Sequence, residues 1–129
     1  MTINLENTIT LVTGAAGGIG RAVCATMTDA GAKVIATDIA DKPDDLLAEA
    51  YYKHDVTSQD DWQKIANKIE SDYGQLDALV NVAGLSIVAS IEETSLSEWQ
   101  RVNGINVDSI LLSFHRTKMI WNERRKILP

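Results

Sequence analysis

The stretch ITLVTGAAGGIG, from Ile9 to Gly20, decides the fold. Its first five residues are apolar or β-branched without interruption, which is typical of a strand buried on both faces. Gly14, Gly18 and Gly20 then lead into an apolar helical period that continues to Ala30. A strand, a glycine turn and a helix in this order can cradle a phosphate, because glycine lets the backbone approach an anion and the first helical N–H groups point at it. We therefore predict a dinucleotide-binding turn, with a turn that binds nothing as the alternative.

The next strand supplies an acidic residue that fits the same prediction. Lys33 to Asp38, KVIATD, reads as a second buried strand that ends in a carboxylate. In a dinucleotide-binding fold, a carboxylate at this point accepts hydrogen bonds from the adenosine ribose hydroxyls and repels a 2′-phosphate. A helix cap or a solvated loop acid is the alternative. Ala15 and Ala16 occupy the glycine turn where a phosphate-binding Lys or Arg could stand, so NAD is preferred over NADP.

Strand and helix patterns alternate along the rest of the chain. We predict a short helix at 43–50, a third strand at 51–55, a helix that Ser58 caps and Gly74 ends, and a fourth strand at 76–83. This alternation indicates an α/β fold, a Rossmann-like doubly wound parallel sheet with strand order 3-2-1-4. Ligands of such sheets bind at the carboxyl ends of the strands, where Asp55, Asn81 and Gly84 fall.

Four motifs in this order and spacing resemble those of the short-chain dehydrogenase/reductase family. The first is the glycine turn T-G-x-x-x-G-x-G, and the second is the pair Asp55-Val56 after the third strand. The third is Asn81-Val82-Ala83-Gly84, which is similar to N-N-A-G with Val82 at the second Asn. The fourth is similar to W-x-x-V-x-x-V-N-L and consists of Trp99, Val102, Ile105, Asn106 and Val107. The resemblance covers residues 9 to about 114. It implies a nicotinamide dinucleotide cofactor, a small alcohol or carbonyl substrate, and cofactor contacts from Gly14, Ala16, Gly18, Ile19, Gly20, Asp38, Asp55, Val56, Asn81, Ala83 and Gly84.

The resemblance also implies a catalytic role for Asn106, as the helix Asn that holds a water in a proton relay. An ordinary mid-helix amide is the alternative. The family's catalytic Ser and Tyr-x-x-x-Lys have no match, because none of the three tyrosines is followed by Lys at the required spacing. We therefore expect a truncated fold, the cofactor-binding half of a dehydrogenase that is inactive alone. The alternative is a stand-alone NAD-binding module that associates with a full-length relative.

Composition bounds the remaining possibilities. With 129 residues we expect a single domain, 1–129, and the net charge of −6 argues against nucleic acid or an anionic membrane as partner. No stretch is long and apolar enough to span a bilayer, and no ligand cluster predicts a metal site. The single cysteine, Cys24, is expected to be a buried, inert thiol, and a cytoplasmic location fits best.

Two features predict contacts with other chains. A helix that begins near Ser97 and runs on toward Lys126 helps to build the oligomer in the resembled family. The fourth strand is apolar and would form an open sheet edge, which invites pairing. We therefore expect a homo-oligomer through one of these surfaces, or an edge covered by the C-terminal helix. His54 is expected to be a partly buried strand residue.

Overall fold

A four-stranded parallel sheet forms the centre of the computed structural model, which describes residues 2–121. Its strands are β1 (Ile9–Thr13), β2 (Lys33–Asp38), β3 (Ala50–Lys53) and β4 (Ala78–Asn81). They lie in the order β3-β2-β1-β4, and all three pairings are parallel. The predicted α/β class and strand order 3-2-1-4 are confirmed.

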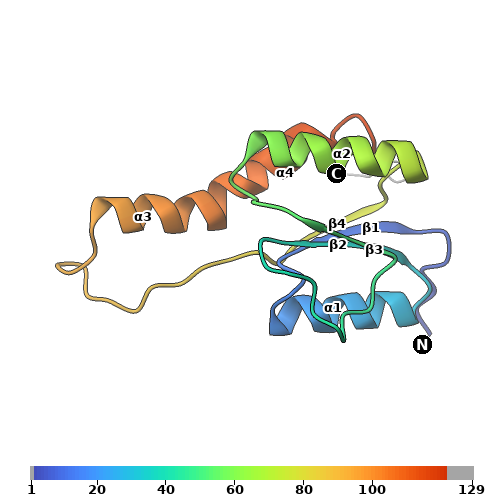
Figure 1. Ribbon diagram of the computed structural model, residues 1–129, viewed down its shortest axis with the longest axis horizontal. Helices are drawn as coiled ribbons and strands as arrows, with labels where there is room; N and C mark the ends of the chain where they lie inside the picture. Colours follow the sequence, from blue (N-terminus) through green and yellow to red (C-terminus); the bar gives the residue numbers. More distant parts are fainter. Residues whose placement is uncertain (1, 122–129) are drawn as a thin grey trace.

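Helices cover both faces of this sheet (Figure 1). Helix α1 (Gly18–Asp29) packs on one face, and helices α2 (Gln59–Tyr73) and α4 (Ser109–Thr117) pack on the other. Alternate strand residues divide between the two layers, since side chains in a strand point to opposite faces in turn. Val12 and Val34 belong to the cluster on the α1 side, whereas Leu11 and Ile35 belong to the cluster that contains the α2 side chains.

The ends of α2 form as the sequence predicts. The Ser58 side chain accepts a hydrogen bond from the backbone N–H of Asp61 at 3.1 Å, and Gly74 ends the helix. The stripe of Trp62, Ile65, Ala66 and Ile69 is buried against the sheet. Cys24 is fully buried on the opposite side, and burial raises the pKa of its thiol, as expected for an inert group.

The predicted short helix at 43–50 is wrong. The segment forms a turn at Asp44 and Asp45 and then an extended approach to β3, which begins at Ala50. Leu46 is 5% exposed in the α1-side cluster, and Glu49 donates its N–H to the Val34 carbonyl at 2.8 Å. Burial of one side chain and pairing with β2 therefore outweigh the weak helical preference of eight residues.

The predicted long helix is interrupted and ends early. Helix α3 (Leu96–Asn103) continues through a π-helical segment, η1 (Gly104–Asp108), into α4, which ends at Thr117 rather than near Lys126. After a turn, the Ile120 carbonyl accepts the Leu76 N–H at 2.6 Å, and this bond directs the chain to the sheet. The part of the prediction that concerns residues 122–126 lies outside the described residues.

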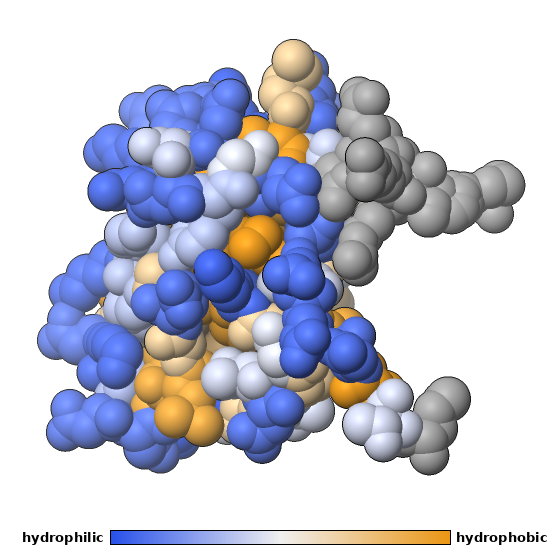
Figure 2. Space-filling model, turned by 90° about the vertical axis from the view of Figure 1, so that its right-hand side faces the viewer, coloured by the Kyte–Doolittle hydropathy of each residue, from blue (hydrophilic) through white to orange (hydrophobic). Residues whose placement is uncertain are grey.

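An arm, residues 85–103, extends away from the sheet and returns through α3 (Figure 1). Several of its apolar side chains are exposed, among them Val88, Ile91 and Trp99. Figure 2 views the molecule from the end opposite the arm, where hydrophilic residues cover most of the face and leave only small apolar groups. Within the described residues, no helix is long and apolar enough to cross a membrane.

The edge position of β4 is confirmed for the strands that the structure describes. β4 pairs with β1 along one side. A parallel bridge joins Leu76, just before the strand begins, to Trp121, the last residue that the structure describes.

Candidate functional site

A cavity of about 470 Å³ opens at the carboxyl ends of the strands, beside the glycine turn. It brings together most of the predicted cofactor-binding residues, although they come from four separate parts of the chain. Those that line it are Gly14, Gly18, Ile19, Gly20, Asp38, Asp55, Val56, Ala83 and Gly84. Three predicted residues do not line it: Ala16, Asn81 and Asn106.

Two glycines of the turn are required by close backbone contacts. Gly14 has φ +64°, and a Cβ added there would lie 2.5 Å from the backbone nitrogen of Ala83. A Cβ on Gly20 would lie 2.1 Å from the Gly14 carbonyl oxygen. The end of β1, the start of α1 and the end of β4 can therefore approach one another only without side chains at these positions.

The N-terminus of α1 faces the cavity. Its cap residue, Gly17, provides no side-chain hydrogen bond, and Gly17, Gly18, Ile19 and Gly20 all line the cavity wall. The first N–H groups of a helix have no acceptor within the helix, and they carry the positive end of its dipole. This arrangement can bind a phosphate group.

Asp38 is fixed at the cavity by two backbone donors. One carboxylate oxygen accepts the N–H of Ala16 at 3.0 Å and the other accepts the N–H of Ala40 at 3.0 Å. Ala16 therefore acts on the site through Asp38, although its own atoms do not line the cavity. Each carboxylate oxygen can accept more than one hydrogen bond, so Asp38 keeps capacity for ligand hydroxyls.

Asp55 and Val56 form the wall beyond the end of β3. One Asp55 oxygen accepts the backbone N–H and the hydroxyl of Thr57, at 2.9 and 2.7 Å. The Val56 carbonyl accepts the indole N–H of Trp62 at 2.8 Å, which ties this wall to α2. Both residues are thus held in place by short-range contacts in the protein.

The segment after β4 divides into residues that line the cavity and one that does not. Ala83 donates its N–H to the Thr13 hydroxyl at 3.3 Å, which keeps it beside the glycine turn. Asn81 points elsewhere, because its side-chain amide donates to the Ser113 hydroxyl on α4 at 3.3 Å. Asn81 therefore ties the sheet to α4.

Asn106 lies in η1 and binds the backbone of the neighbouring loop. Its Oδ1 accepts the Leu85 N–H and its Nδ2 donates to the Leu85 carbonyl, each at 2.8 Å. A Cβ on Gly84 would lie 3.4 Å from Asn106 Oδ1, which is an ordinary contact distance, so Gly84 lies directly beside this pair. Each group of the amide thus has one partner in the Leu85 backbone, and the side chain positions Leu85, a residue of the cavity wall.

Sequence reasoning missed several residues of the cavity wall. They include Ile39, which follows Asp38, and Arg101 on α3, which is the one cation among the lining residues. His54, expected to be a partly buried strand residue, is 2% exposed and also lines the wall. Because His54 directly precedes Asp55, the sequence could have predicted that it lies close to the cavity. Across the part of the chain that the structure describes, no three His, Cys, Asp or Glu side chains form a metal-binding group.

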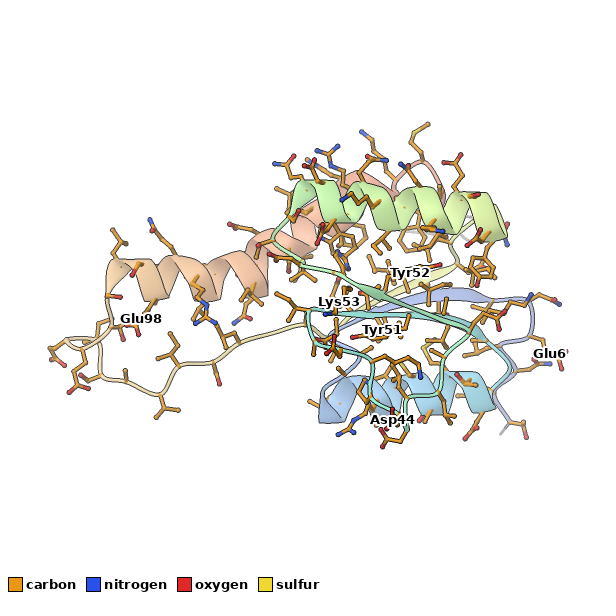
Figure 3. The ribbon with its side chains drawn as sticks, viewed as in Figure 1. Glu6, Asp44, Tyr51, Tyr52, Lys53 and Glu98 are labelled. Carbon is orange, nitrogen blue, oxygen red and sulfur yellow. The ribbon has the colours of Figure 1, made fainter. Side chains whose placement is uncertain are left out.

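None of the three tyrosines lines the cavity. Tyr51 and Tyr52 point to opposite faces of β3 (Figure 3), and the Tyr51 hydroxyl donates to the Ala40 carbonyl. Tyr52 and Tyr73 pack against the α2-side cluster.

The strand order, the glycine turn at a helix N-terminus and the acid at the end of β2 define a Rossmann-like α/β fold. The short chain dehydrogenase model matches residues 8–126, and the chain belongs to this family.

Relatives of known activity cover the same region. The chain is 33% identical over 127 residues to the 3-oxoacyl-[acyl-carrier-protein] reductase FabG of Thermotoga maritima, covering 92% of this chain and 50% of that protein. It is 29% identical over 118 residues to the NADP-dependent (R)-specific alcohol dehydrogenase of Lentilactobacillus kefiri, covering 85% of this chain and 47% of that one. The chain thus spans about half the length of these relatives.

A solved structure agrees with this result. A short-chain dehydrogenase/reductase from Brucella melitensis, described as a glucose/ribitol dehydrogenase, superposes with a TM-score of 0.87 at 28% identity, covering 97% of this chain and 57% of that one.

Proposed function

We propose that this chain binds a nicotinamide adenine dinucleotide and forms the cofactor-binding half of a short-chain oxidoreductase. One observation carries the proposal: the glycine turn, the free N–H groups of α1 and the fixed carboxylate of Asp38 meet in one cavity. The volume near 470 Å³ is within the range of ligand pockets.

The residues present fit the parts of such a cofactor. The N–H groups at Gly18 to Gly20 would hold the pyrophosphate, and Asp38 would accept hydrogen bonds from the adenosine ribose. Asp55 and Val56 would border the adenine, and Gly84 would leave room for the nicotinamide ribose. When bound, the nicotinamide supplies the hydride acceptor or donor of the reaction.

We further propose that NAD is preferred over NADP. A 2′-phosphate beside Asp38 would face a carboxylate, with no cation in the glycine turn. Lys53 is the residue paired with Asp38 in the β2–β3 register, but its ammonium group lies 2.6 Å from Asp41. Lys53 lowers the pKa of the Asp41 carboxyl, so this ammonium group already has a carboxylate partner.

Calorimetric titration with NADH and NADPH tests this preference. We expect NADH to bind at least about tenfold more tightly, a difference of about 1.4 kcal/mol, and Asp38→Ala to reduce that ratio. Asp44→Ala is the matched control, because Asp44 lies in the loop near α1 and outside the cavity lining (Figure 3). Equal affinities in the unaltered protein, or equal loss of both on Asp38→Ala, would refute the ribose assignment.

We also propose that the 129-residue chain does not turn over substrate by itself. A developing alkoxide needs a proton donor within hydrogen-bond reach. The tyrosine side chains lie away from the cavity, and both groups of the Asn106 amide bind Leu85. Purified protein with NAD and a panel of alcohols should therefore show no sustained NADH absorbance. Turnover that disappears on Asn106→Ala would overturn this proposal.

Association with another chain is the second candidate function, as a dinucleotide-binding module joined to a full-length relative or to a second copy. It is supported by the edge position of β4 among the strands that the structure describes, and by exposed apolar residues of the arm, η1 and α4, such as Trp99, Val107 and Phe114. Light scattering across a concentration series tests it, and a monomer at all concentrations would count against self-association. A cytoplasmic location stays a prediction from the sequence.

A further inference from the structure

His54 is a buried titratable side chain at the cavity wall, and none of the cofactor contacts proposed above involves it. It is 2% exposed, and its backbone N–H donates to the Asp38 carbonyl at 2.8 Å. The imidazole is therefore anchored beside the strand end that carries the ribose-binding acid, and directly before Asp55.

One side of the ring connects to the glycine turn. His54 Nδ1 lies 2.9 Å from the hydroxyl oxygen of Thr37, which is fully buried. The Thr37 carbonyl in turn accepts the N–H of Ala15 at 3.0 Å. Thr37 thus links the imidazole to the turn that would hold the pyrophosphate.

The other side of the ring contacts Trp62, which is bonded to the cavity wall at Val56. His54 and Trp62 meet edge to face, with ring centroids 4.3 Å apart and an interplanar angle of 86°. The Trp62 indole N–H donates to the Val56 carbonyl. Displacement of the imidazole would therefore move both the end of β2 and the segment at Val56.

The surroundings favour the neutral ring. Within the described residues, His54 Nε2 is enclosed and has no hydrogen-bond partner, whereas a charged imidazolium needs an acceptor for each of its two N–H groups. Burial lowers the pKa of His54 to about 4, although the carboxylates of Asp61 and Asp55 act in the opposite direction. Since Nε2 is enclosed, the ring acts through its neighbours rather than through a hydrogen bond to the ligand.

We propose that His54 is a positioning residue for the adenosine half of the cavity: its neutral ring holds the Asp38 strand end, the glycine turn and the Val56 wall in the binding arrangement before a ligand arrives. This inference rests on the proposed function, because it assumes that the adenosine part of a dinucleotide binds here. An arrangement formed in advance strengthens binding, since less ordering remains to be done on association.

The test compares three substitutions by their affinity for ADP-ribose, measured by calorimetry under conditions where circular dichroism shows each protein to be folded. His54→Phe keeps a ring against Trp62 but loses the bond to Thr37. Thr37→Val removes the hydroxyl at nearly constant shape, and Thr37→Ser retains it. We expect His54→Phe and Thr37→Val each to weaken binding by about tenfold, the scale of one hydrogen bond, and Thr37→Ser to stay within about threefold of the unaltered protein.

The double variant His54→Phe/Thr37→Val separates positioning from general destabilisation. If the two residues act as one unit, it should bind about as well as either single variant, because the same interaction is removed only once. Additive losses, or unchanged affinity in a folded His54→Phe protein, would overturn the inference. If His54→Phe does not fold, weaker binding by Thr37→Val than by Thr37→Ser supports it and equal binding overturns it. An unaltered protein that binds neither ADP-ribose nor NADH would instead refute the proposed function, and this inference with it.

Discussion

Acid should destabilise this protein through His54 at a pH where most surface groups still keep their charge. The pKa of His54 is lowered from 6.5 to about 4, mainly by burial. The unfolded chain therefore binds a proton at higher pH than the native protein does. This contribution to stability is fully present above the ordinary pKa and is lost as the pH falls from 6.5 toward 4.

The expected size follows from the same two values. The difference between the two pKa values corresponds to about 3 kcal/mol of unfolding free energy. About 2 kcal/mol of this stabilisation is lost when the pH falls from 7 to 5. The ring is 2% exposed, so solvent screening removes little of this effect. For a domain of this size, 2 kcal/mol is a substantial share of a total stability of roughly 5–15 kcal/mol.

Urea denaturation followed by circular dichroism at pH 7 and pH 5 measures this loss. Carboxylates also titrate in acid, so the comparison is with His54→Phe, which keeps those carboxylates but lacks the titrating ring. The unaltered protein should lose about 2 kcal/mol more than the variant over this interval. Equal losses in the two proteins would refute the reasoning, whatever the absolute stability of the variant.

Two further predictions concern stability. Gly20→Ala should lower the free energy of unfolding by at least about 3 kcal/mol, because the added Cβ would lie 2.1 Å from the Gly14 carbonyl oxygen. Gly18→Ala is the control, since a Cβ there would meet nothing within 4 Å, and it should change the free energy of unfolding by no more than about 0.5 kcal/mol. Similar costs for the two would contradict the close contact at Gly20. Ser58→Ala should cost about 1 kcal/mol by leaving the Asp61 N–H without its cap, and thermal unfolding should show this as a lower Tm.

The elements that the sequence predicted correctly are those determined by short-range patterns. The buried strands, the glycine turn and the capped helix after Ser58 each have a local signal, and parallel topology then places the glycine turn and Asp38 at one end of the sheet. The position of Asp38 could be predicted because strand length and direction determine where a carboxyl end falls.

The errors come from interactions between distant segments. The segment at 43–50 pairs with β2 instead of forming a helix, and the bond between Leu76 and Ile120 ends the predicted long helix early. The π-helical segment also has no local signal, yet it contains Asn106 and the bonds of this side chain to Leu85. Arg101 was missed because nothing in the sequence shows that α3 returns to the cavity.

The paired bonds between Asn106 and Leu85 have a consequence for the integrity of the chain. They join Leu85, at the start of the arm, to Asn106 in η1, 21 residues further along the chain. The arm is therefore a loop that is closed at its base. Val88 is fully exposed within it, and helix begins again only at Leu96. A protease should therefore cut this loop first, and the two pieces should stay together through the Asn106 bonds and the packing of α4 beside α2. The exposed part of the arm around Val88, away from the cavity-lining Leu85 and Arg101, is accordingly where we expect an inserted foreign peptide to leave the sheet and the cavity assembled.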